Sequence, residues 1–196
     1  MTYMQTENLS KKEQLVQIYR FLHEFGLNDS HSGNASIRID NTVWVTPSGA
    51  CADTLTSNDL IKCTITEKQF SIPDGASLDA PLHLKTYIKN TYTKSVLHSH
   101  NPHALALTMD GMEFTPIDFE GAYYFERVPV IEIPYQDYVK RAPDEVSSCL
   151  VTNKACIVKG HGIYVAGESL NLAYKWTSSL ELSAKISFLH QTSKNK

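Results

Sequence analysis

The stretch VLHSH at residues 96–100 decides how this chain is expected to fold. Alternate residues of a β-strand project from the same face, so His98 and His100 can approach one ligand together. A third imidazole follows much later, at His161 within the segment IVKGHGIY (157–164). Three neutral imidazoles that leave one position open are typical of a catalytic zinc site, although a His-x-His pair on a half-buried strand can also be purely structural.

Length and composition narrow the class of protein. The 196 residues favour one domain, and we expect it to span residues 8–190, with flexible tails at 1–7 and 191–196. The four cysteines lack Cys-x-x-Cys spacing and the N-terminus lacks the pattern of a signal peptide, which indicates a cytoplasmic setting. No apolar run approaches the length of a membrane span, and the net charge of -3 provides no basic surface for nucleic acid. A small molecule is the expected partner.

Hydrophobic periodicity predicts helices that flank a sheet of short strands. Ser10 and Glu13 have the spacing of a capping box, for a helix that ends at Gly26. Further helices are expected at 78–90, 143–151 and 169–190, and strands at 35–39, 42–46, 96–100, 129–133, 155–158 and 162–166. The turn-prone pair at 40–41 joins the first two strands into a hairpin. This pattern predicts one layered α/β domain with a mostly antiparallel sheet.

Asp79 stands at the start of the helix expected at 78–90, two residues before Pro81. An aspartate in this position is a common helix cap. Its carboxylate could also reach the strand that carries His98 and His100. The sequence leaves both roles open.

Two polar loops contain glycine, SHSGNAS at 30–36 and TPSG at 46–49. Glycine lets a ligand approach the backbone, and successive amides and hydroxyls can form an anion-binding nest. The same residue types are the usual ones in turns. Each loop is therefore either a turn or part of an anion site.

Five blocks in this order resemble the class II aldolase/adducin head family: GNASIR (33–38), TPSG (46–49), SLDAPLH (77–83), VLHSH (96–100) and HGIYVAG (161–167). The similarity covers about residues 10–189. It implies an α/β/α sandwich around an antiparallel sheet, assembled as a homotetramer with each active site at a subunit interface. The family includes sugar-phosphate aldolases, epimerases and dehydratases.

The resemblance also implies roles for single residues. His98, His100 and His161 match the metal ligands, with zinc as the expected ion and another divalent cation such as Mn2+, Co2+ or Fe2+ as the alternative. Asp79 matches a catalytic glutamate of the aldolases and an aspartate of the epimerases. Glu120 falls near a second acid/base group, or is a solvated loop carboxylate. The residues that match loops holding a substrate phosphate are Asn34, Thr46, Ser48, Gly49 and Ser77.

Two positions depart from the pattern of the aldolases. Leu78 replaces a second phosphate-binding serine, and Asp79 is one methylene shorter than glutamate. The first departure removes one hydroxyl from the expected anion site. The second changes which proton the carboxylate can reach, because acid/base catalysis needs contact at about 3 Å or through one water.

The chemistry of the family is the stabilisation of an enediolate by a divalent ion. The function predicted first is retro-aldol cleavage of a ketose phosphate or a related sugar acid. Methylthioribulose-phosphate dehydration and pentulose-phosphate 4-epimerisation are the alternatives, and decarboxylation is open to the same residues. A noncatalytic adducin-like binding domain is a further alternative, which the complete set of three histidines disfavours.

Overall fold

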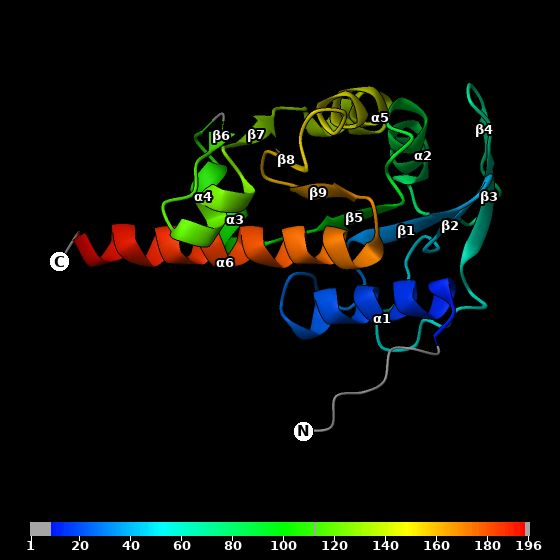
Figure 1. The fold of residues 1–196 in the computed structure, drawn as a ribbon, viewed down its shortest axis with the longest axis horizontal. Coiled ribbons are helices and arrows are strands. Elements are labelled where there is room, and N and C mark those ends of the chain that lie inside the picture. Colours follow the sequence, from blue (N-terminus) through cyan, green and yellow to red (C-terminus); the bar gives the residue numbers. More distant parts are fainter. Residues whose placement is uncertain (1–8, 112, 195–196) are drawn as a thin grey trace.

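The computed structural model describes residues 9–111 and 113–194, and Figure 1 shows their arrangement. Their strands form a mixed sheet in the order β4-β3-β2-β1-β5-β9-β8-β7-β6, in which β7 and β8 pair in parallel and the other neighbours are antiparallel. The strands are β1 (Asn34–Ile39), β2 (Thr42–Val45), β3 (Ile61–Ile65), β4 (Phe70–Ser71), β5 (Ser95–Ser99), β6 (Glu113–Phe114), β7 (Val128–Ile131), β8 (Ala155–Val158) and β9 (Gly162–Gly167).

Helices cover both faces of this sheet. The helices are α1 (Lys11–Glu24), α2 (Ala80–Lys89), α3 (Pro102–Thr108), α4 (Phe119–Tyr124), α5 (Tyr138–Cys149) and α6 (Leu170–Lys194). Helices α1 and α6 lie on one face, whereas α2 and α5 pack together on the other (Figure 1). The predicted α/β/α sandwich with a mostly antiparallel sheet is confirmed.

Strand β5 lies in the middle of the sandwich, between β1 and β9. All five of its residues are buried, because a layer of helices covers each face. Leu97 packs in the core on the α1 and α6 side, and Val96 packs on the α2 side. The alternation places His98 on the same face as Val96, toward α2 and α5.

Most of the expected elements are present, with some differences in extent. Ser10 and Glu13 form the predicted capping box, with Oγ of Ser10 accepting from the Glu13 amide at 3.3 Å. Helix α5 begins at Tyr138, so Pro143 lies inside the helix rather than at its start. Helix α6 extends to Lys194, so residues 191–194, expected in a tail, are helical, whereas residues 1–7 lie outside the described part.

Several short elements were not predicted. Strand β3 alternates between exposed and buried residues and could have been recognised from that pattern. Strands β4 and β6 and helices α3 and α4 span only two to seven residues, too few to produce a clear periodicity. Within the described residues, no helix combines the length and apolarity needed to span a bilayer.

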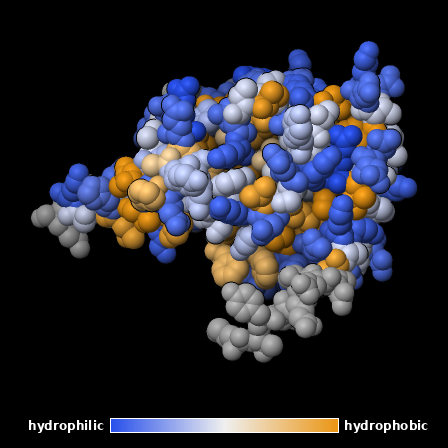
Figure 2. Space-filling model, viewed as in Figure 1, coloured by the Kyte–Doolittle hydropathy of each residue, from blue (hydrophilic) through white to orange (hydrophobic). Residues whose placement is uncertain are grey.

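The end of α6 projects beyond the rest of the molecule, and hydrophobic side chains gather on it (Figures 1 and 2). Exposed apolar residues there are Leu182, Ile186, Phe188 and Leu189. Contiguous exposed apolar surface commonly marks a contact with another chain. This end of the helix is therefore a candidate for subunit contact.

The burial of β5 provides a test of the core. Leu97→Ala removes a fully buried side chain and should lower the free energy of unfolding by about 2–5 kcal/mol. The control Val151→Ala, at an exposed position that follows α5, should change it by less than about 0.5 kcal/mol. Urea unfolding followed by circular dichroism measures both values, and equal values for the two variants would contradict this account of the core.

Candidate active site

The fold brings the three predicted histidines together. His98 lies on β5, His100 directly follows that strand, and His161 lies in the turn between β8 and β9. Because β9 pairs with β5, with Ile163 opposite Ser99, the turn brings His161 beside the other two. One ring nitrogen from each histidine lies within 4.8 Å of the others.

The hydrogen bonds of His98 leave one of its nitrogens as an acceptor toward His100. Nδ1 of His98 lies 3.0 Å from the carbonyl oxygen of Ile163, so Nδ1 carries the proton and Nε2 keeps its lone pair. That Nε2 faces Nε2 of His100 at 3.2 Å. Nε2 of His161 is buried and has no partner among the described residues. Ring nitrogens that converge in this way fit a bound cation, and imidazoles are common zinc ligands.

Burial also keeps these imidazoles neutral. It lowers the pKa of His98 to about 3, and it lowers the pKa values of His100 and His161 as well. Metal binding requires the neutral form of imidazole. The three imidazoles are therefore in the form that a metal ion would require at neutral pH.

Close backbone contacts fix the histidines in place. A Cβ atom on Gly162 would lie 2.4 Å from Cε1 of His98 and 2.7 Å from the carbonyl oxygen of Ser99. The His100 amide donates to the Leu27 carbonyl at 2.8 Å and to Oδ1 of Asn28 at 3.0 Å. The contact from Asn28 was not predicted, since no motif in the sequence indicates it.

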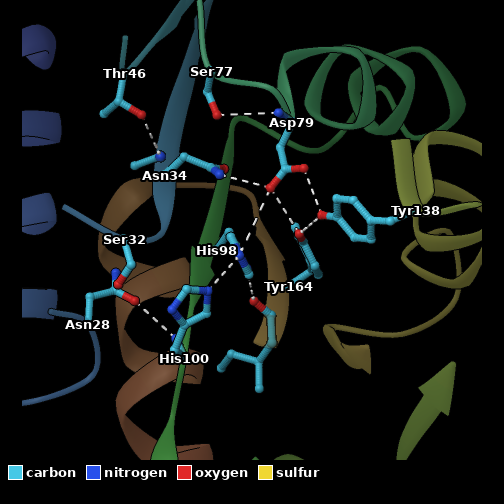
Figure 3. Close-up of polar contacts among 12 residues, drawn as sticks. Asn28, Ser32, Asn34, Thr46, Ser77, Asp79, His98, His100, Tyr138 and Tyr164 are labelled. Atoms are coloured by element: carbon cyan, nitrogen blue, oxygen red, sulfur yellow. Dashed lines mark hydrogen bonds and ion pairs between the residues drawn. The ribbon is translucent and has the colours of Figure 1, made fainter. Parts of the chain in front are cut away.

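Asp79 lies beside the histidines and is buried (Figure 3). It stands at the N-cap of α2, yet its side chain makes no capping hydrogen bond. Instead Oδ2 accepts from Nδ2 of Asn34 at 2.8 Å and from the Tyr164 hydroxyl at 2.9 Å, and Oδ1 accepts from the Tyr138 hydroxyl at 2.7 Å. Oδ2 also lies 4.0 Å from Nε2 of His98. The side chain of Asp79 is therefore hydrogen-bonded to groups around the histidines and not to the helix end.

The surroundings of Asp79 favour its ionised form. Burial opposes ionisation, but the hydrogen bonds from Tyr138 and Asn34 favour it, and the pKa of Asp79 lies below its usual value. Burial and the neighbouring carboxylate both raise the pKa values of Tyr138 and Tyr164. A carboxylate thus accepts hydrogen bonds from two neutral phenols.

Residues of the two polar loops lie next to Asp79. The Ala35 amide donates to Oγ1 of Thr46 at 3.2 Å, and the Asp79 amide donates to Oγ of Ser77 at 3.3 Å. The Ser77 amide donates to the Thr46 carbonyl at 3.1 Å, so the two hydroxyl residues are neighbours. Ser48 and Gly49 are exposed beyond them.

Glu120 lies in a different environment. It is exposed, in the first turn of α4, a helix that packs against α6. It is not one of the residues that cluster around the three imidazoles within the described chain. A role for Glu120 as a second acid/base group stays a prediction.

A hollow of about 510 Å3 opens beside His161. Tyr138 lies in its wall, and its ring packs 4.6 Å from that of His161. Apolar residues provide much of the remaining lining, notably Leu78, Ile133, Val139 and Val158. The hollow offers space for a small molecule next to the candidate metal ligands.

Comparison with known proteins identifies the family. Residues 13–188 match the Class II Aldolase and Adducin N-terminal domain, and the chain belongs to this family, as the resemblance predicted. It is 34% identical to a 3-oxo-tetronate 4-phosphate decarboxylase of Haemophilus influenzae, covering 95% of this chain and 91% of that protein. It is 25% identical to an L-fuculose phosphate aldolase of Methanococcus vannielii, covering 90% of this chain and 95% of the relative. The crystal structure of L-fuculose-1-phosphate aldolase from Thermus thermophilus superposes with a TM-score of 0.82 at 30% identity, covering 91% of this chain and 93% of that one.

The close contact at Gly162 yields a test of the site geometry. Gly162→Ala should lower zinc affinity by about 10–100-fold, the loss typical when groups that orient ligands are disturbed, because the new methyl group displaces His98. Gly111→Ala is the control, since a Cβ there would meet its nearest atom at an ordinary 3.6 Å. Competition with a chromophoric chelator measures both affinities. Unchanged affinity in Gly162→Ala would show that the ligands do not lie as described.

Proposed function

We propose that the protein is a zinc-dependent lyase that decarboxylates a phosphorylated 3-oxo sugar acid. The observation that carries this proposal is the convergence of three neutral imidazoles beside an ionised, buried Asp79. The name of the decarboxylase relative supports the choice of substrate class. Another divalent cation is the alternative to zinc.

The residues have separate tasks in the reaction. His98, His100 and His161 would hold the ion, which supplies a Lewis acid for the charge that develops on the substrate ketone oxygen. The bond between the carboxylate carbon and C2 breaks, CO2 leaves, and its bonding electrons stay on the fragment that contains the ketone. A solvent proton must then reach C2, and we assign this transfer to Asp79, which is ionised at rest and would first take up the proton from water and then pass it to C2. The balance is one proton consumed and one CO2 released.

The hydroxyls near Asp79 suit a phosphate group. Oγ1 of Thr46 and Oγ of Ser77 each accept a hydrogen bond from a backbone amide, so their own protons are free to be donated. Asn34 donates to Asp79 instead, and its Oδ1 has no partner among the described residues. We propose that Thr46 and Ser77, with Ser48 and Gly49 beyond them, hold the phosphate and that Asn34 orients the carboxylate.

Retro-aldol cleavage of a ketose phosphate is the second candidate. The crystal structure of the Thermus aldolase, at 30% identity, favours it. Decarboxylation comes first because departing CO2 needs no acid or base, whereas the second acid/base group that aldolases would place at Glu120 is exposed on α4 of this chain. This order reverses the one predicted from the sequence.

We also propose a cytoplasmic homotetramer in which a second copy covers the hollow. Leu78, Tyr135 and Val139 line the hollow and are exposed, at 62%, 96% and 60% of their surfaces. Apolar side chains at the mouth of a site suit contact with another chain.

Product analysis tests the proposed reaction. With 3-oxo-tetronate 4-phosphate and zinc, we expect CO2 and a three-carbon ketose phosphate in equal amounts, by isotope-ratio mass spectrometry and a coupled reductase assay. Asp79→Asn should lower kcat by about 10²–10⁴-fold, the usual contribution of an acid/base group. Glu67→Gln, at an exposed position between β3 and β4, is the control and should retain full activity.

The same assay with L-fuculose 1-phosphate separates the candidates. Cleavage of that substrate into two carbonyl fragments, without CO2 from the sugar acid, would replace the decarboxylase by the aldolase. Failure to convert either substrate in the presence of zinc, Mn2+ or Co2+ would reject both.

A further inference from the structure

Two of the four cysteines lie together on the α5 face of the sheet. Cys149 is the last residue of α5, and Cys156 lies on β8, against which α5 packs. Cys156 is fully buried in the cluster that α5 forms with the sheet, and Cys149 packs against the same cluster. Their thiols hydrogen-bond one another. The described lining of the hollow beside His161 includes neither residue, so the pair is separate from the candidate active site.

The turn between α5 and β8 holds the two thiols close together. The Asn153 amide donates to the Cys149 carbonyl at 3.2 Å, and Nδ2 of Asn153 donates to the same oxygen at 2.9 Å. Nδ2 also lies 3.7 Å from Sγ of Cys149. On the β8 side, the Ala166 amide donates to the Lys154 carbonyl at 3.0 Å and fixes the start of the strand. Both cysteines are therefore anchored through the short segment that joins them.

Cys149 is the more reactive of the two thiols. It is half-buried, so a molecule as small as water can reach it, whereas Cys156 is enclosed. The hydrogen bond from the Cys156 thiol lowers the pKa of Cys149. Burial raises the pKa of Cys156, so this thiol keeps its proton and acts as the donor. Because the thiolate is the form that reacts, oxidation should begin at Cys149.

The other two cysteines lie elsewhere in the fold. Cys51 follows Ala50, whose carbonyl accepts from the Tyr19 hydroxyl of α1 at 3.1 Å, on the opposite face of the sheet from α5 (Figure 1). Cys63 is buried on β3, on the other side of β5 from β8. These two residues serve as internal references for the pair.

We propose that Cys149 and Cys156 are a modification site for peroxide, at which the two thiols close to a reversible disulfide. The Cys149 thiolate attacks hydrogen peroxide, the O–O bond breaks, and the departing hydroxide takes a proton to become water. Cys149 is then a sulfenic acid. Sγ of Cys156 loses its proton and attacks that sulfur, the S–O bond breaks, and the oxygen leaves as a second water.

Two thiols are oxidised in this sequence, and one peroxide is reduced to two waters. The disulfide ties the end of α5 to β8. Disulfides in reducing compartments are usually transient or redox-sensing, which suits a bond that thiols can reverse. The inference does not depend on the proposed function.

Peptide mapping of the full chain tests the pair. After treatment with hydrogen peroxide, remaining thiols are alkylated with iodoacetamide in denaturant and the protein is digested. We expect one linked peptide that joins Cys149 to Cys156, and its loss on treatment with dithiothreitol. Cys149→Ser should abolish the link, whereas Cys51→Ser, also at a half-buried cysteine, should leave it intact.

The Cys156→Ala variant distinguishes a pair from a single reactive thiol. Without its partner, Cys149 should proceed to a sulfinic acid, a product that the wild type should not accumulate. Wild-type protein that keeps all four thiols alkylatable, or that gains a sulfinic acid on Cys149 while Cys156 stays reduced, would overturn the proposal. A link that joins either residue to Cys51 or Cys63 would also overturn it. These results come from the wild type, so they decide the question even where Cys156→Ala does not fold.

Discussion

The antiparallel pairing of β5 with β9 is the constraint on which the rest of the site depends. In this pairing His98 lies opposite Tyr164. The turn that contains His161 therefore lies at the end of β5. These residues are more than 60 positions apart in the sequence, and only this register makes them neighbours. A slip of one residue would turn His98 and Tyr164 to opposite faces of the sheet. Burial of β5 between two helix layers prevents such a slip, because Leu97 belongs to the core on the far side.

The buried imidazoles and the buried carboxylate are stabilised in different ways. The imidazoles stay neutral, so burial costs them little and leaves their lone pairs for a cation. Asp79 is ionised, and three neutral donors compensate its burial: Asn34, Tyr138 and Tyr164. A cation and an anion can then share one buried space while the protein controls their separation.

The sequence predicted the parts of the site that depend on local spacing. Two histidines at alternate positions of an apolar strand must share a face, and the ordered blocks identified the family, the fold and the place of Asp79. Tyr138 and Tyr164 could not be assigned, because their role depends on how α5 and β9 meet around the start of α2. Asn28 was missed for the same reason, since its contact with the His100 amide spans 72 positions. The local sequence leaves a capping role for the Asp79 side chain open, and the tertiary contacts of that side chain exclude it.

The central claim is that imidazoles from two separate parts of the sheet form one metal site, and metal analysis tests it most directly. Purified protein dialysed against trace zinc should retain about one ion per chain. His161→Ala should lose that ion while keeping the circular dichroism spectrum of the wild type, and His190→Ala, on the exposed side of α6, should keep it. A folded wild-type protein that retains no divalent ion, or a His161→Ala variant that retains it fully, would contradict the account.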